Sequence, residues 1–542
     1  MSRRRAALVA AALSLLAAAP AAAQTVQRPP SLDKPPPLHR MTGNQVARIA
    51  DRVPEVVAVR RRTPRSTREV FTKGPTRWQV SYFSRGRRRE IAQVLIDDRT
   101  GGVLEAWTGF RVAWTMARGY DGAFGRKVNA PYVWIPLLLA FLVPFADRRR
   151  PWQPLHLDLL VLAAFSVSLA LFTAGEVEWS VPLVYPLLGY LLARMLWVGL
   201  RAPPRREAPR VWLSTDWLIV GIVFLLGFRL GLNLTSSNVI DVGFAGVLGA
   251  DRIADGEPLY GDWPQNNQHG DTYGPVTYLA YLPFEQLLPW SGSWDDLPAA
   301  HAAALVFDAL VVVALWLVGR RVGGNRLGVV LAYAWAAFPF TLYVTNTNAN
   351  DALVPLLVLV ALLVAHRPLR SGAATALAGL TKFAPLALAP LFATQERRLG
   401  GVARYAAGFA VAAAVLLAAL VPDMSLFWDR TLGFQAGRDS PFSLWGLHGL
   451  DVLQRAVQGA AVLLALALAV VPRRRDLGGL AALSAAVLIA LQLGVDHWFY
   501  LYVVWFFPLV MIALLAPTST PGALPRSTPP AAAAQRTAPA PP

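Results

Sequence analysis

Long apolar runs recur along most of this chain, with short polar segments between them. Beyond Val128, most of these runs have roughly the 20 residues that an α-helix needs to cross a bilayer. The pattern therefore predicts an all-α polytopic membrane protein with about 13 transmembrane helices. The expected spans are 130–146, 155–174, 181–200, 214–234, 298–319, 326–344, 351–366, 371–395 as two short helices, 402–421, 450–471, 476–495 and 498–516.

The composition supports a membrane protein. Hydrophobic residues make up 55% of the 542 residues and charged residues only 15%, which is too apolar for an ordinary soluble protein. The chain begins with Ser2-Arg3-Arg4-Arg5, an Ala/Leu run and small residues up to Gln24. This is the pattern of a secretory signal peptide over residues 1–24, so we expect the segment that follows to be exported.

The composition also excludes some kinds of site. Cys is absent, which removes disulfides, thiolate zinc sites and Cys nucleophiles. The seven His are scattered and form no His-x3-His pair, so we expect no metal site built by the protein. The net charge of +18 would suit nucleic acid, but the basic residues lie mainly in short loops between apolar runs, where they set membrane orientation. We therefore expect no nucleic-acid partner.

Residues 25–128 are the one sizeable polar region, and we expect them to form a small α+β domain. The pattern there predicts a helix and two strands, at Asn44–Arg52, 77–82 and 91–97. This order, with the turn Asp97-Asp98-Arg99-Thr100-Gly101, resembles the PepSY-like domains of exported and membrane proteins. The clusters Arg60–Arg62 and Arg87–Arg89 would dock anionic headgroups or envelope polymers. A solvated basic surface is the simpler alternative.

The basic loops indicate the membrane orientation, because short loops rich in Lys and Arg face the cytoplasm. These loops are Arg148–Arg150, Arg201–Arg210, Arg320-Arg321, Arg367 with Arg370, Arg397-Arg398 and Arg473–Arg475. They fall on one side if Tyr273–Trp290 lies in the outer face without crossing and if 372–394 is a hairpin that turns near Lys382. The loops that then face outward are 175–180, 235–297, 345–350, 422–449 and 496–498. The Pro/Ala-rich segment 517–542 is expected to be a disordered cytoplasmic tail.

Asp241 is the first candidate for chemistry. It follows the apolar run Trp217–Leu234, so a membrane helix that ends there would hold its carboxylate at the rim of the bilayer. Ionisable groups are costly at that depth and usually functional. The alternative is a helix N-cap for the segment after it. The same outward loop contains Tyr260, Asp271 and Tyr273, and we expect these residues to contact a substrate.

Two basic residues are candidates for binding an anion. Lys382 lies in the middle of an apolar hairpin, where it would bind a phosphate unless its side chain snorkels to the interface. Arg438 is one of the few basic residues expected outside, and a guanidinium can contact a phosphate with two parallel hydrogen bonds. An ion pair with the neighbouring Asp439 is the alternative for Arg438.

The remaining candidates lie at the outward rim of the predicted bundle. His497 follows a carboxylate there, and it acts either in the site or as a hydrogen-bonded interfacial histidine. Asn350 and Asp351 belong to a cluster of polar residues that favours either a substrate loop or a helix cap.

The order and sidedness of these motifs resemble the GT-C glycosyltransferases over residues 211–516. The motifs are Asp241 just after a membrane helix, Gly256-x-x-x-Tyr260, Tyr273-Gly274-Pro275, Gly379-Leu380-Thr381-Lys382-x-x-Pro385 and Asp496-His497-Trp498. The chain is most similar to the polyprenyl-phosphate-mannose-dependent branch that contains the family 87 (DUF2029-type) mannosyltransferases of bacterial envelopes. The family's Tyr-Pro-Pro turn is Tyr-Gly-Pro here, and its late His-His pair is His497-Trp498.

The resemblance implies a GT-C-like core at 211–516. The three additional spans expected at 129–210 lie outside the resemblance. The resemblance also implies that Asp241 activates the acceptor as a general base and that His497 lies near the site. The implied reaction moves a sugar, expected to be mannose, from a polyprenyl-phosphate donor to an envelope lipid, glycan or protein. It would take place at the extracytoplasmic face of the plasma membrane, with the donor as co-substrate and no cofactor.

One carboxylate suffices in such a reaction, because the leaving group is a phosphate that needs no general acid. A glycosidase usually needs two carboxylates. The acceptor oxygen would attack opposite the lipid phosphate and invert the anomeric configuration. Two other classes of protein remain open. A polytopic transporter of a lipid or solute would share the broken helices and intramembrane charges, and a membrane scaffold would display the basic exported domain.

Overall fold

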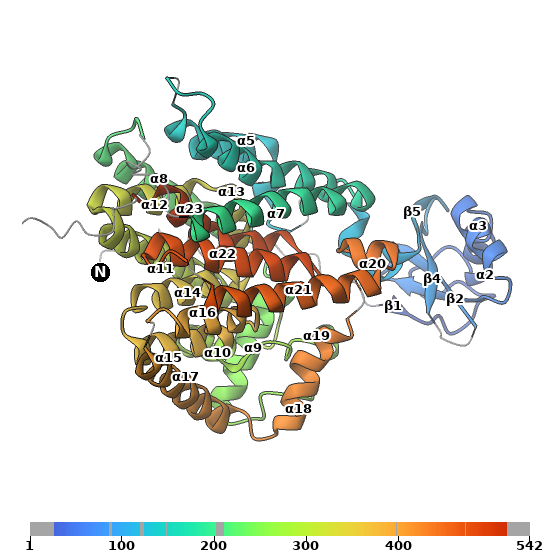
Figure 1. Cartoon of the computed structure of the whole chain (residues 1–542). Coiled ribbons are helices and arrows are strands. Elements are labelled where there is room, and N and C mark those ends of the chain that lie inside the picture. The colour runs from blue at the N-terminus through green and yellow to red at the C-terminus, as the bar shows by residue number, and fades with distance from the viewer. Residues whose placement is uncertain are drawn as a thin grey trace, which may run out of the picture.

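The computed structural model of the chain describes residues 26–85, 89–119, 124–147, 149–201, 211–396, 398–438, 440–471 and 473–517. These residues form a helical bundle with a small sheet domain beyond one end of it (Figure 1). The predicted signal peptide lies outside the described residues. The same holds for nearly all of the predicted tail, for Asp439 and for most of the Arg201–Arg210 loop.

Long apolar helices make up most of the bundle. In the described part of the chain, six are long and apolar enough to cross a bilayer: α6 (Pro154–Thr173), α7 (Val177–Leu200), α8 (Thr215–Thr235), α11 (Pro298–Gly323), α17 (Leu399–Leu420) and α21 (Asp451–Val470). A bent pair, α12 (Asn325–Ala337) and α13 (Pro339–Asn346), forms a seventh candidate with a 58° bend. Shorter helices beside them are α5 (Pro131–Leu142), α14 (Leu353–Leu363), α22 (Leu477–Leu493) and α23 (Val503–Leu515). The larger total of spans expected from the sequence stays a prediction.

The predicted topology depends on a hairpin at 372–394 and on a helix at 273–290 that does not cross the membrane, and the structure contains short helices at both places. The predicted hairpin consists of α15 (Pro368–Gly379) and η6–α16 (Ala384–Ala393), with Lys382 in the turn between them. α10 (Pro275–Leu287) has 13 residues, which is too short for a membrane span, and it packs against α9 (Asp241–Asp255). The short elements after α17 are α18 (Met424–Trp428), η7 (Asp429–Gly433), α19 (Phe434–Ala436) and α20 (Leu444–His448).

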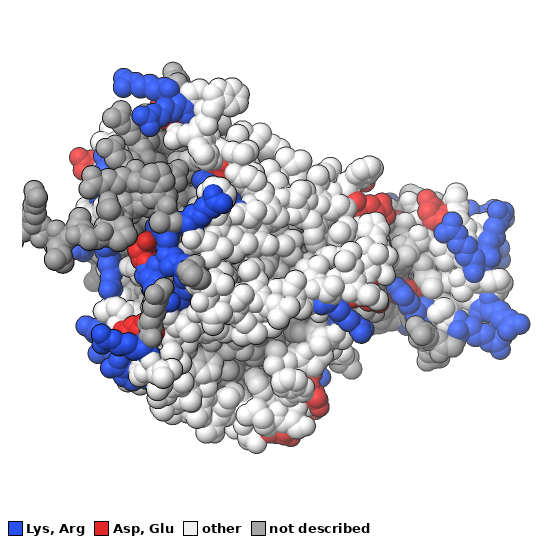
Figure 2. All heavy atoms as spheres, viewed as in Figure 1, with Lys and Arg blue, Asp and Glu red and all other residues white. Residues whose placement is uncertain are grey.

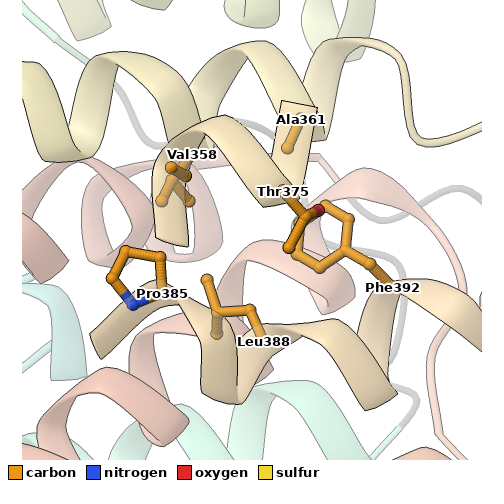
Figure 3. A pocket seen from close by; sticks show the side chains of 7 residues that line it. Val358, Ala361, Thr375, Pro385, Leu388 and Phe392 are labelled. Carbon is orange, nitrogen blue, oxygen red and sulfur yellow. The ribbon is translucent and has the colours of Figure 1, made fainter. Parts of the chain in front are cut away.

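The hairpin packs tightly against α14. Figure 3 shows Val358 and Ala361 of α14 around a small gap with Thr375 of α15 and with Pro385 and Leu388 of η6. The gap has no room for a water molecule. Close packing of this kind fixes the backbone on both sides of Lys382.

The basic loops lie together at one end of the bundle. Hydrogen bonds join them pairwise: Trp212 to Pro144 O, Arg326 to Val211 O, Arg321 to Leu363 O, Arg474 to Gly199 O and Gln395 to Arg475 O. Figure 2 shows Lys and Arg gathered at this end and on the distant sheet domain, with a wide band of few charges between them. This arrangement agrees with the predicted grouping of the basic loops. That they face the cytoplasm stays a prediction.

The sheet domain is antiparallel, with the strand order β1-β2-β3-β4-β5. Its elements are β1 (Val26–Gln27), α2 (Gly43–Ala50), α3 (Pro54–Arg62), β2 (Thr67–Lys73), β3 (Arg77–Phe83), β4 (Glu90–Asp97) and β5 (Val103–Thr108). The predicted helix and strands are α2, β3 and β4, so the α+β content is confirmed. The sequence did not predict β2, because only Val70 and Thr72 of this charged strand are buried. The likeness to PepSY-like domains stays a prediction.

A buried ion pair holds the bend between α12 and α13. Arg229, in the middle of α8, donates to Asp308 Oδ1 of α11 at 2.6 Å, and both side chains are almost fully buried. Its Nη2 donates to Trp335 O, Ala336 O and Thr341 Oγ1. Backbone carbonyls that a bend exposes in an apolar medium need donors. Arg229 therefore supplies donors at the break, and Asp308 balances its charge.

Removing this arginine should destabilise the bundle. Arg229→Met would leave Asp308 buried without its cation, which costs about 3–5 kcal/mol of unfolding free energy. We expect a large drop in the thermal unfolding midpoint of the detergent-purified protein, and partial recovery when Asp308→Asn is added. Arg404→Met is the matched control, because the Arg404 side chain is 64% exposed. A midpoint for Arg229→Met equal to that of the control would contradict this role.

Candidate active site

A cavity of about 830 Å³ opens at the end of the bundle that meets the sheet domain. Its volume lies within the range of about 300–1,000 Å³ that is usual for small-molecule sites. Six of the residues predicted to act on a substrate line its wall: Asp241, Tyr273, Asp351, Lys382, Arg438 and His497. The structure also describes Tyr260, Asp271 and Asn350, but these three do not line the cavity.

Asp241 is held at the cavity by the chain on both sides of it. It is the first residue of α9, and Ile240 is the N-cap, so the N-cap alternative for Asp241 is wrong. The preceding loop is fixed by the hydrogen bond from Asn238 N to Asn346 O at 3.2 Å. Gly243 allows α9 to pack closely against the segment after Asn346, since a Cβ on Gly243 would lie 2.3 Å from Asn348 O. A carboxylate in the first turn also faces the positive end of the helix dipole.

The electrostatic environment of Asp241 suits a base. Its side chain is open to the cavity, although protein atoms enclose it on the other sides. Burial raises the pKa of the Asp241 carboxyl above its usual value, while the positive charges of Arg438 and Lys382 oppose that rise. An ionised carboxylate whose pKa is raised accepts a proton more readily than an ordinary one.

Lys382 has its counter-ion within the protein. Its Nζ donates to Asp351 Oδ1 at 2.7 Å, and Trp505 Nε1 donates to the same oxygen at 2.9 Å. The ammonium group also lies 5.3 Å from the ring centroid of Tyr273 and 5.4 Å from that of Trp505. Lys382 is only 8% exposed, so the snorkelling alternative is wrong. Asp351 therefore binds the lysine, which the sequence did not predict.

The Tyr273-Gly274-Pro275 turn packs directly on the backbone next to Lys382. Gly274 N donates to Thr381 O at 3.0 Å, and Val276 N donates to Leu380 O at 3.0 Å. A Cβ at Gly274 would lie only 1.9 Å from Leu380 O. A proline at this position, as in the Tyr-Pro-Pro turn, would lose the donor and collide with that carbonyl. This close contact therefore explains why glycine replaces proline in the motif.

Three predicted substrate contacts lie behind the cavity wall. The Asp271 carboxylate accepts a hydrogen bond from Arg430 Nε at 2.6 Å. Tyr260 donates its hydroxyl to Tyr273 O at 3.0 Å. Asn350 is fully buried, and its side-chain atoms have no hydrogen-bond partner among the described residues. Tyr260 and Asp271 thus shape the loop that carries Tyr273, which is a structural task.

His497 and Arg438 form another part of the cavity wall. His497 Nδ1 lies 3.0 Å from Ser440 Oγ, and its ring stacks on Trp114 with centroids 5.6 Å apart. Burial, assisted by the charge of Arg438, lowers the pKa of His497 well below its usual value. His497 is therefore neutral at physiological pH and acts through hydrogen bonds and packing. Asp439, the alternative partner for Arg438, lies outside the described residues.

Sequence reasoning missed Trp114 and Arg430. Trp114 belongs to the polar N-terminal region, where no motif marked it, although it lines the cavity. Arg430 follows α18 in the outward loop 422–449, and its charge was the only available signal. Within the described ranges, no group of three or more His, Cys, Asp or Glu residues could hold a metal ion.

The contact between the Gly274 turn and the hairpin should be sensitive to one added methyl group. Gly274→Ala would push Leu380 and Thr381 away from the turn, and overpacking of this kind costs about 1–3 kcal/mol. We expect a lower unfolding midpoint in detergent. Gly227→Ala is the matched control, because a Cβ at Gly227 would meet nothing within 4 Å. An unchanged midpoint for Gly274→Ala would show that the turn does not pack as described.

Most of the residues that line the cavity lie in a segment that matches a known protein family. Residues 272–495 match the model of a family described as Glycosyltransferase family 87. The match includes Tyr273, Asp351, Lys382 and Arg438, and it ends two residues before His497. No curated protein matches the chain. The sequence resemblance is therefore confirmed for its family over this segment: residues 272–495 match glycosyltransferase family 87, which indicates a glycosyltransferase.

Proposed function

We propose that this protein transfers a sugar from a polyprenyl-phosphate donor to an acceptor hydroxyl at the extracytoplasmic face of the plasma membrane. The observation that supports this proposal most is that the Asp241 carboxylate and two cations, Lys382 and Arg438, line a single cavity. The family 87 segment supplies both cations. From the resemblance, the sugar is mannose and the acceptor is an envelope lipid, glycan or protein.

The proposed step needs one base and one anion-binding group. Asp241 takes the proton of the acceptor hydroxyl, and the acceptor oxygen forms a bond to the anomeric carbon. The bond from that carbon to the phosphate oxygen breaks, and the phosphate leaves with the electron pair. Attack from the face opposite the phosphate inverts the anomeric configuration. The leaving phosphate is already a stable anion, so the step uses no second carboxylate and no cofactor.

The charges on the cavity wall favour Arg438 over Lys382 as the main phosphate ligand. Lys382 is already paired with Asp351 at 2.7 Å, so a phosphate would have to compete with that carboxylate. Arg438 exerts the strongest opposing charge on Asp241. A phosphate on Arg438 would therefore lie near the base, and the guanidinium would stabilise its developing charge. Neutral His497 would orient a hydroxyl of either substrate.

The outer surface of α21 supports entry of a lipid donor from the side. Val462 lines the cavity and is 52% exposed on the surface of the bundle. Ala461 lines the cavity beside it. An apolar rim at a membrane helix would admit a polyprenyl chain while its phosphate and sugar enter the polar cavity.

The transporter alternative gains no comparable support. The bent pair α12–α13 is the kind of interrupted helix that transporters use. However, the backbone carbonyls that the bend leaves without helix hydrogen bonds accept hydrogen bonds from Arg229. This arginine is buried and pairs with Asp308. The bend therefore serves the packing of the bundle and does not line the cavity.

Replacing the proposed base should abolish transfer while leaving the fold intact. We expect Asp241→Asn to lower the rate by roughly 10²–10⁴ because proton removal is lost. The measurement is transfer of radiolabelled mannose from polyprenyl-phosphate mannose to a membrane-lipid acceptor fraction by the purified protein in nanodiscs. Asp251→Asn is the matched control, since Asp251 lies on the same helix away from the cavity. Transfer by Asp241→Asn at the wild-type rate would remove Asp241 from the mechanism.

A further inference from the structure

One wall of the cavity comes from the exported part of the chain. Trp114, Thr115, Met116 and Phe124 line it, and all four belong to the described residues 110–119 and 124–129 between β5 and α5. This segment lies outside the stretch that matches family 87. The cavity is therefore incomplete without the N-terminal region.

Trp114 contacts both polar side chains on that side of the cavity. Its ring stacks on His497 with centroids 5.6 Å apart and planes inclined by 28°. The Arg438 Cζ atom lies 5.7 Å from the Trp114 ring centroid. A guanidinium at this distance from an aromatic ring is attracted to it and loses freedom of movement. Trp114 thus holds Arg438 where the cation faces the cavity.

The segment that carries Trp114 is held at both ends. On the sheet side, Arg118 donates to Gln93 Oε1 of β4 at 2.9 Å, and it also donates to Val112 O within the segment at 2.9 Å. On the bundle side, Arg111 donates to Gly175 O at 2.8 Å. Gly119 packs so closely that a Cβ there would lie 2.7 Å from Gly175 N. The sheet domain and the bundle therefore fix the position of Trp114 together.

The same segment also contacts the loop that precedes Asp241. Gly125 N donates to Asn238 Oδ1 at 2.7 Å. Asn346 Nδ2 donates to Gly125 O at 2.8 Å. Asn238 is three residues before Asp241, so residues 110–119 contact the cation while residues 124–129 contact the loop that carries the base.

We propose that Trp114 is a positioning residue, through which the exported domain sets the phosphate-binding geometry of Arg438. The sheet domain is then a fixed part of the lipid-phosphate site, and not a separate module that only displays a basic surface. This inference rests on the proposed function in one respect, because it takes the anion at Arg438 to be the phosphate of a polyprenyl lipid.

The test is a double-mutant cycle on binding of decaprenyl phosphate to the full-length protein in nanodiscs. We expect Trp114→Ala to weaken binding about 3- to 30-fold, the range that follows from the strength of cation–π contacts. Trp114→Phe should restore most of the affinity. Adding Trp114→Ala to Arg438→Ala should weaken binding no further, because the tryptophan acts through the arginine. Trp179→Ala is the matched control, since Trp179 is 70% exposed and away from the cavity.

Three results with the variants would overturn the inference. They are unchanged binding by Trp114→Ala, losses that add in the double variant, and failure of Trp114→Phe to recover affinity. Absence of decaprenyl-phosphate binding by the wild-type protein would overturn it as well. Binding that follows the cycle without any sugar transfer by the wild type would uphold the inference and count against the transferase reaction alone.

Discussion

The ion pair between Lys382 and Asp351 is the interaction on which the rest of the site depends. It joins the turn of the α15–α16 hairpin to the segment after α13, and Trp505 of α23 donates to the same carboxylate oxygen. A lysine buried among apolar helices is stable only with such a partner. The segment that presents Asp351 also binds the loop before Asp241, through Asn346 O. One polar layer therefore sets the positions of the buried cation and the proposed base together.

The pairing also changes the charge that a substrate would meet. Since Asp351 balances Lys382, Arg438 is the main positive charge that acts on Asp241. The position of Arg438 is set by Trp114, which lies outside the family 87 segment. The site thus combines three parts of the chain: the start of α9, the matched segment, and a wall from the N-terminal region. A family match by itself would describe only the second of them.

The sequence predicted those parts of the site in which a charge interrupts an apolar run. Asp241 and Lys382 stood out for this reason, and both line the cavity. Partners were harder to predict, because Asp351 meets Lys382 only through tertiary packing. Tyr260 and Asp271 show the opposite error. Tyrosine and aspartate are residue types that often contact substrates, but in loops they also form hydrogen bonds within the protein. Here they support the loop that carries Tyr273. Arg229 was missed because one arginine did not interrupt the predicted span 214–234.

The most direct test of this account is a cryo-EM map of the protein with a non-transferable polyprenyl-phosphate mannose analogue bound. The account predicts that the phosphate contacts Arg438 and that the anomeric carbon faces Asp241, leaving room for an acceptor hydroxyl about 2.6–3.2 Å from the carboxylate. Density for the phosphate at the opposite end of the bundle, or a sugar ring out of reach of Asp241, would contradict it.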